Sequence, residues 1–127
     1  MNKPLCLVVE DSRVIRRVTI ELLQNLGFRA EGAENGRDAV EYCKNTVPDL
    51  VLLDWNMPEM DGFSCLQILR ASPLAPRPVI VMCTTEKDLE KIRRAVAAGA
   101  DEYIMKPYDL DILRDKLIQL GLLAGAQ

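Results

Sequence analysis

The amino-acid sequence predicts an α/β fold in which five parallel strands form a doubly wound sheet with helices on both faces. Two observations support this prediction. Short apolar runs alternate with stretches of helical spacing five times along the 127 residues. The apolar runs are also nearly continuous, which is typical of parallel strands that are covered on both faces.

The strands are expected at five apolar runs, which are residues 5–9, 28–30, 50–53, 79–83 and 103–105. Crossovers between parallel strands are right-handed in nearly all proteins, and five strands connected in this way fit the flavodoxin-like order 2-1-3-4-5. The sequence contains no linker-like or repeated segment. We therefore expect one domain over residues 1–127 with no attached effector domain.

A helix is expected after each strand. The first begins at Ser12, a residue type that caps helix N-termini, and ends at Gly27. The second follows Asn35, the third begins near Gly62 and stops before three prolines, and the fourth stops at Gly99. The fifth carries four leucines with helical spacing, at positions 110, 113, 117 and 120.

Composition excludes several classes of protein. Hydrophobic residues make up 49% and charged residues 28% of the chain, yet no apolar stretch approaches the roughly 20 residues of a membrane span. The N-terminus does not resemble a signal peptide, so we expect a cytoplasmic location without membrane insertion. The net charge of −3 lacks the basic footprint of nucleic-acid binding, and we expect no direct contact with nucleic acid.

Cysteine and histidine usage narrows the chemistry further. The four cysteines lie within apolar patterns and show no Cys-x-x-Cys spacing, so we expect buried, reduced thiols rather than disulfides or a zinc site. The chain has no histidine, which excludes a phosphohistidine intermediate and Ser-His-Asp catalysis on this chain.

Polar residues end four of the five apolar runs. Glu10 and Asp11 follow the first, Asp54 the third, Thr84 the fourth and Lys106 the fifth. Ligands of doubly wound sheets bind outside the carboxyl ends of the strands, so these side chains are expected to converge. Crowded carboxylates require protonation or a cation; a divalent ion would resolve the repulsion, and an all-oxygen ligand set favours Mg²⁺.

The same residues suggest phosphoryl transfer. A carboxylate beside Mg²⁺ can attack phosphorus, which makes Asp54 the candidate nucleophile. Lys106 would bind one phosphate oxygen and the Thr84 hydroxyl another. Pro107 adds a constraint, because a cis peptide before it would point Lys106 into the crevice.

These residues resemble the receiver domains of two-component response regulators, and among them the stand-alone chemotaxis members. The likeness covers essentially the whole chain. It rests on matches in type, order and spacing at Glu10-Asp11, Asp54-Trp55-Asn56-Met57-Pro58, Met60-Asp61-Gly62, Thr84, Ala98-Gly99-Ala100 and Lys106-Pro107. The resemblance implies that Asp54 accepts a phosphoryl group from a histidine kinase or a histidine phosphotransfer protein. It also implies that Asp11, Asp54 and the backbone carbonyl of Asn56 bind Mg²⁺, with Glu10 acting through water.

The resemblance further implies a switch and its tuning. Thr84 and Tyr103 are expected to move together, and the fourth helix, fifth strand and fifth helix to present the result to a downstream protein. Asn56 and Glu86 occupy positions that tune hydrolysis, and they match the chemotaxis pattern of a short-lived phosphate. Position 10 is Glu where chemotaxis members often have Asp, and Thr85 is bulkier than the usual Ala or Gly and is expected to restrict access.

Partners and oligomeric state follow from the same resemblance. The downstream target could be a flagellar motor switch, a kinase or an adaptor. We expect a monomer, with two alternatives: a phosphorylation-linked dimer and a receiver excised from a longer regulator. Charged residues that could pair across such a dimer are Lys87, Lys91, Asp101, Glu102, Arg114 and Lys116.

Two other classes share parts of this pattern. A haloacid-dehalogenase-type phosphatase also uses an aspartyl phosphate and Mg²⁺, but it needs an acid two residues after the nucleophile, where this chain has Asn56. A flavodoxin-like electron carrier needs a first loop that cradles a phosphate, and the acids at positions 10 and 11 would repel one. We therefore interpret the chain as a signalling module rather than an enzyme.

Overall fold

Five parallel strands form one sheet in the order β2-β1-β3-β4-β5, which confirms the predicted topology. The computed structural model describes residues 3–85, 87 and 89–125. Its strands are β1 Leu5–Val9, β2 Arg29–Ala33, β3 Leu50–Asp54, β4 Val79–Thr84 and β5 Glu102–Met105. Its helices are α1 Arg13–Asn25, α2 Gly36–Asn45, α3 Gly62–Ala71, α4 Leu89–Ala97 and α5 Leu110–Gln119.

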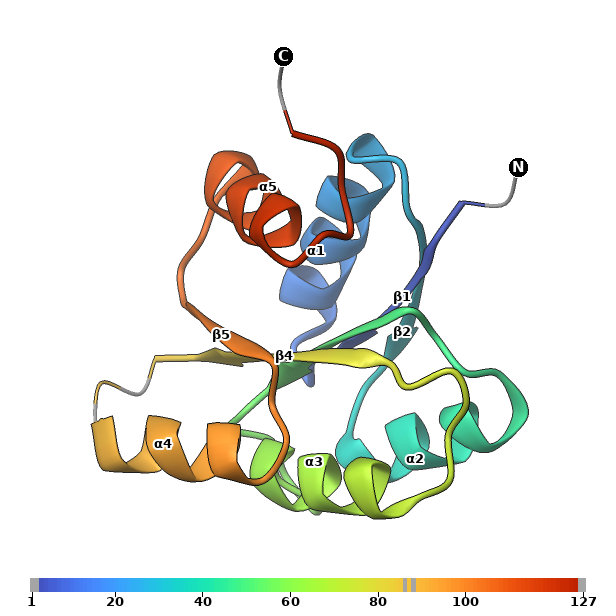
Figure 1. Ribbon diagram of the computed structural model, residues 1–127, viewed down its shortest axis with the longest axis vertical. Coiled ribbons are helices and arrows are strands. Elements are labelled where there is room, and N and C mark those ends of the chain that lie inside the picture. Colours follow the sequence, from blue (N-terminus) through green and yellow to red (C-terminus); the bar gives the residue numbers. More distant parts are fainter. Residues whose placement is uncertain (1–2, 86, 88, 126–127) are drawn as a thin grey trace.

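The helices cover both faces of the sheet, as predicted. Helices α1 and α5 lie on one face, and α2, α3 and α4 lie on the other (Figure 1). Alternate strand residues feed two separate cores: Leu7, Leu53 and Met82 face α2, α3 and α4, whereas Val8 and Leu52 face α1 and α5. All four cysteines are buried in these cores, also as predicted. No helix in the described part of the chain is long and apolar enough to cross a membrane.

Side-chain caps fix where four of the helices begin. The N-cap oxygens of Ser12, Asn35, Asp61 and Asp109 each accept a hydrogen bond from the backbone N–H three residues later, at 2.7–3.3 Å. Such caps satisfy N–H groups that have no partner inside the helix. Three of these helices, α1, α2 and α3, start just beyond strands β1, β2 and β3, so the caps help to fix the loops at the carboxyl edge of the sheet.

Two details differ from the sequence-based expectation. Strand β2 runs over Arg29–Ala33 rather than residues 28–30, because an edge strand can carry exposed polar residues that hide it from a hydrophobicity pattern. Helix α1 exists as predicted, but its residues Val14, Ile15 and Val18 remain 72%, 45% and 50% exposed. The apolar spacing therefore identified the helix without identifying its buried face.

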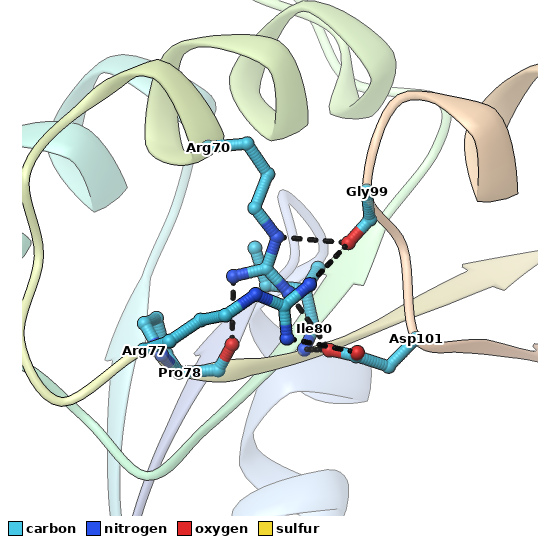
Figure 2. A network of polar contacts seen from close by, with 6 residues as sticks. All are labelled: Arg70, Arg77, Pro78, Ile80, Gly99 and Asp101. Carbon is cyan, nitrogen blue, oxygen red and sulfur yellow. Dashed lines mark hydrogen bonds and ion pairs between the residues drawn. The ribbon is translucent and has the colours of Figure 1, made fainter.

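A polar network fastens the amino end of β5 to the rest of the fold (Figure 2). Arg70 of α3 donates to the carbonyls of Gly99 and Pro78 at 2.8 and 2.7 Å, and to Asp101 at 2.7 Å. Asp101 also accepts from Arg77 and from the backbone N–H of Ile80. Arg70 thus ties α3 to the segments that precede β4 and β5.

Replacing this arginine should therefore be costly. We expect Arg70→Met to lower the free energy of unfolding by about 2–4 kcal/mol, because it removes three hydrogen bonds at once, two to backbone carbonyls and one to the carboxylate of Asp101. Urea denaturation would measure the change. Arg37→Met is the matched control: its ion pair with Glu59 is exposed, and its loss should change stability by less than about 0.5 kcal/mol. Equal effects of the two substitutions would contradict this account of the network.

Candidate functional site

Four of the five polar residues predicted to converge meet at the carboxyl edge of the sheet: Glu10, Asp11, Asp54 and Lys106. Glu10 follows β1, Asp54 ends β3, Thr84 ends β4 and Lys106 follows β5. Ligand oxygens of Glu10, Asp11 and Asp54 all lie within 4.8 Å of one another. Glu10 and Asp54 are each only 5% exposed, whereas Asp11 is exposed. The arrangement is an acidic pocket with one open side.

Lys106 supplies the cation in this pocket. Its Nζ lies 2.7 Å from Oε1 of Glu10 and 3.1 Å from Oδ1 of Asp54. The Lys106 side chain is 18% exposed, so these ion pairs are partly shielded from water. Burial alone lowers the pKa of the Lys106 ammonium, but the hydrogen bonds to the two carboxylates outweigh it and raise that pKa. Lys106 therefore remains charged.

Backbone and arginine contacts hold Glu10 in place. The second carboxylate oxygen of Glu10 accepts from the N–H of Ser12 at 3.1 Å. Its backbone carbonyl accepts from Arg16 at 2.7 Å, and its N–H donates to the carbonyl of Ala33 at 3.0 Å. The sequence analysis did not anticipate this role of Arg16, because a helical arginine on a polar face carries no pattern that distinguishes it.

Asp54 is the acid whose ionisation the pocket perturbs most clearly. Burial raises the pKa of the Asp54 carboxyl to about 6, with further contributions from the charges of Glu10 and Asp11, whereas Lys106 lowers it. The net effect shows that Lys106 offsets only part of the cost of placing a carboxylate here.

The donor set suits a hard divalent cation. Three carboxylates and one ammonium leave a formal charge of −2 when all are ionised, which is the charge that a divalent ion neutralises. All the ligand atoms are oxygens, the exposed Asp11 leaves space for water, and Mg²⁺ prefers such partly hydrated sites. The residues present therefore fit the ion that the sequence analysis predicted.

The loop after β3 is packed tightly against the pocket. A Cβ on Gly62 would overlap the carbonyl oxygen of Asp54 and lie 2.8 Å from Cα of Trp55. The N–H of Gly62 donates to the carbonyl of Trp55 at 2.8 Å. Only glycine permits this approach, and it fixes the backbone between Asp54 and Trp55. Asn56 is exposed in the same loop.

The remaining predicted residues occupy different positions. Thr84 is 1% exposed at the end of β4, and Thr85 is exposed immediately after it. Tyr103 is half-buried on β5, which pairs with β4 through Tyr103 and Met82 and through Met105 and Thr84. The Lys106–Pro107 peptide is cis. Glu86 lies outside the described residues.

Tyr108 is a further residue that the sequence analysis missed. It follows Pro107 and lies beside Thr19 of α1 and Cys83 of β4 against the core on that face of the sheet, and burial raises its pKa far above the usual value. These contacts fasten the segment that carries Lys106 to two other elements. In the sequence, only its position as an aromatic residue directly after Pro107 indicates that Tyr108 could have a structural role.

The perturbed carboxyl predicts pH-dependent stability. In metal-free protein, the folded-state pKa of Asp54 near 6 exceeds the usual 3.8, so its contribution to stability falls as the pH rises through this range. We expect Asp54→Asn to raise the free energy of unfolding by about 1–3 kcal/mol at pH 7.5 and far less at pH 4. Urea denaturation in chelator would measure both values. The exposed Asp115→Asn is the control, and a loss of stability in Asp54→Asn at pH 7.5 would contradict the prediction.

Comparison with known proteins agrees with this geometry. Residues 6–118 match the family described as the response regulator receiver domain. Chemotaxis protein CheY-3 of Vibrio cholerae serotype O1 is 37% identical over 112 residues, which cover 87% of this chain and 86% of that protein. The family match extends across the strands that form the pocket.

Solved structures show the same fold. CheY4 of Vibrio cholerae superposes with a TM-score of 0.87 at 31% identity, covering 93% of this chain and 98% of the other. The receiver domain of sensor histidine kinase PA1611 from Pseudomonas aeruginosa, which has a magnesium ion coordinated in its active-site cleft, gives 0.83 at 27% identity and covers 93% and 97%. These relatives are signalling proteins rather than phosphatases or electron carriers. The chain belongs to the response regulator receiver domain family of two-component signalling.

Proposed function

We propose that this chain is a phosphorylation-dependent switch in which Asp54 accepts a phosphoryl group from a histidine kinase or a histidine phosphotransfer protein. The observation that carries the proposal is the buried Asp54 carboxylate, which has Lys106 at 3.1 Å and two further acids within 4.8 Å. Membership of the receiver family supports the same assignment.

The reaction follows from these groups. A carboxylate oxygen of Asp54 forms a bond to phosphorus as the bond to the donor's histidine nitrogen breaks, and the imidazole leaves and takes up a proton. Lys106 neutralises charge on one phosphate oxygen, and the Thr84 hydroxyl donates to another. Mg²⁺ would reduce repulsion between the attacking carboxylate and the phosphoryl oxygens. Asp11, Asp54 and the carbonyl of Asn56 would hold the ion, with Glu10 acting through water.

The output is proposed to follow Thr84 and Tyr103 to the face formed by α4, β5 and α5. A new hydrogen bond from Thr84 to the phosphoryl group would change the volume next to Tyr103, and the ring would turn. Leu89 and Val96 of α4 are 65% and 51% exposed, which gives this face an apolar surface for a downstream protein. The similarity to chemotaxis proteins favours a motility target such as a flagellar motor switch.

Intramolecular ion pairs favour a monomer over a charge-paired dimer. Asp101 pairs with Arg70 and Arg77, and Glu102 pairs with Lys116. Arg114 pairs with neighbours on its own helix. Four of the six charges that were candidates for a two-fold dimer thus already have partners within the chain. Asn56, Thr85 and Glu86 are proposed to tune the lifetime and accessibility of the phosphate.

Phosphorylation at a single site would test the proposal. We expect intact-mass spectrometry to show the addition of one phosphate when the protein receives Mg²⁺ and acetyl phosphate, and none with Asp54→Asn or with chelator. Beryllofluoride should change the emission of Trp55, the one tryptophan, because it adjoins the proposed acceptor. Asp61→Asn is a control acid on the neighbouring loop. Phosphate found at any position other than 54 would refute the assignment.

A groove beside the pocket is proposed as the docking site for the phosphodonor protein. Its volume is about 460 Å³, and it is lined mainly by apolar residues of α1 and by the loops after β4 and β5. Val14, Ile15 and Val18 form its exposed wall, and Lys106 lines its other side. A donor that reaches Asp54 must therefore pass beside this groove.

Disrupting the groove should slow phosphoryl transfer from a donor protein but not from a small-molecule donor. We expect Val18→Asp to slow transfer from a phosphorylated histidine-containing donor protein by roughly tenfold, the effect of losing one good interface residue. Its rate with acetyl phosphate should stay within about twofold of the parent, since the pocket is intact. Val96→Asp on α4 is the control, with similar exposure on another face. Equal slowing with both donors would indicate damage to the pocket instead.

A further inference from the structure

A cation on α5 lies over the ring of Tyr103. The Nζ of Lys116 is 5.7 Å from the centroid of that ring, within the range of a cation–π interaction. The same Nζ is 3.6 Å from Oε2 of Glu102, the residue before Tyr103 on β5. Both charged side chains are only 23% exposed, so this contact is better shielded than a typical surface ion pair.

Glu102 is itself fixed on its other side. Its Oε1 accepts a hydrogen bond from the backbone N–H of Tyr103 at 3.0 Å. The carboxylate thus connects the strand backbone to the ammonium of α5, and the ammonium contacts the ring. Glu102, Tyr103 and Lys116 form a closed cluster between β5 and α5.

We propose that Lys116, anchored by Glu102, is a positioning residue that stabilises the resting orientation of Tyr103 and so sets how readily the ring turns. The inference rests on the proposed function, because it assigns Tyr103 two orientations. It adds two residues, Glu102 and Lys116, that determine the balance between them.

The physical argument depends on which contact differs between the two orientations. The ion pair between Glu102 of β5 and Lys116 of α5 does not involve the ring itself. We therefore expect it to persist when the ring turns and to favour neither orientation. The contact between Lys116 and the ring is seen in this structure, and the proposal is that it is lost when the ring turns. A contact shifts an equilibrium only by its difference between the two states, so the cation–π contact carries the bias. Its expected effect is roughly two- to fivefold in the population ratio.

Fluorine NMR can test this bias directly. The chain has three tyrosines, so protein made with 3-fluorotyrosine gives three resonances, and Tyr103→Phe identifies the one from Tyr103. The change of that resonance between H₂O and D₂O reports contact of the ring with water. The parent with Mg²⁺ alone and with Mg²⁺ and beryllofluoride provides the resting and activated values.

Three variants distinguish the effect of the Lys116 cation on the ring from the effect of a change in the net charge of α5. In Lys116→Met, the resting value should move toward the activated value, with a two- to fivefold larger turned population. Lys116→Arg should keep the parent value because it retains the cation. Arg114→Gln removes one positive charge from the same helix away from the ring and should also keep it. Phosphorylation of Lys116→Met by acetyl phosphate should match the parent.

Each result decides between distinct ideas. The inference fails if Lys116→Met keeps the parent resting value, if Lys116→Arg behaves like Lys116→Met, or if Arg114→Gln produces the same shift. The proposed switch fails if beryllofluoride leaves the parent Tyr103 resonance unchanged. In that case, a changed resting value in Lys116→Met alone would still show that the cation holds the ring.

Discussion

The contact of one ammonium with two buried carboxylates is the interaction on which this site depends. Lys106 follows β5, which lies three positions from β1 and two from β3 in the sheet, and its side chain reaches both Glu10 and Asp54. Without it, adjacent negative charges of low exposure would repel one another with little solvent screening. Even with it, the pKa of Asp54 stays near 6, so a residual demand for positive charge remains. A bound divalent cation would supply that charge.

The fold holds the acidic residues of the pocket in fixed positions. Strands β1 and β3 are buried along their whole lengths, and two separate cores hold them from above and below. Gly62 allows the next helix to press against the backbone of Asp54, and Ser12 caps α1 beside the pocket. The acids therefore sit on rigid elements, and their mutual repulsion cannot be relieved by simple displacement of the loops.

The sequence predicted the parts of this structure that depend on strong local patterns. Buried parallel strands produce continuous apolar runs, and the polar residues at the ends of these runs are enough to predict the pocket. Strand β2 was misplaced because an edge strand needs no such run. The exposed Val14 and Val18 look like core residues in sequence, because helical spacing does not reveal which face is covered. The contacts of Arg16, Tyr108 and Lys116 depend on tertiary proximity and leave no periodic pattern.

The three functions of β5 follow from its position at the edge of the sheet. Its amino end is fastened by Asp101 to Arg70, and the residue after its carboxyl end, Lys106, balances the acidic pocket. Between these anchored points lies Tyr103, half-buried and covered by Lys116 rather than by another strand. In the proposed switch, a change of charge at Asp54 would act first on Lys106, which contacts it, and then on Thr84, which pairs with Met105 of β5. The half-buried ring of Tyr103 on this edge strand is then the group that can move at the lowest free-energy cost, because the central strands are enclosed on both faces.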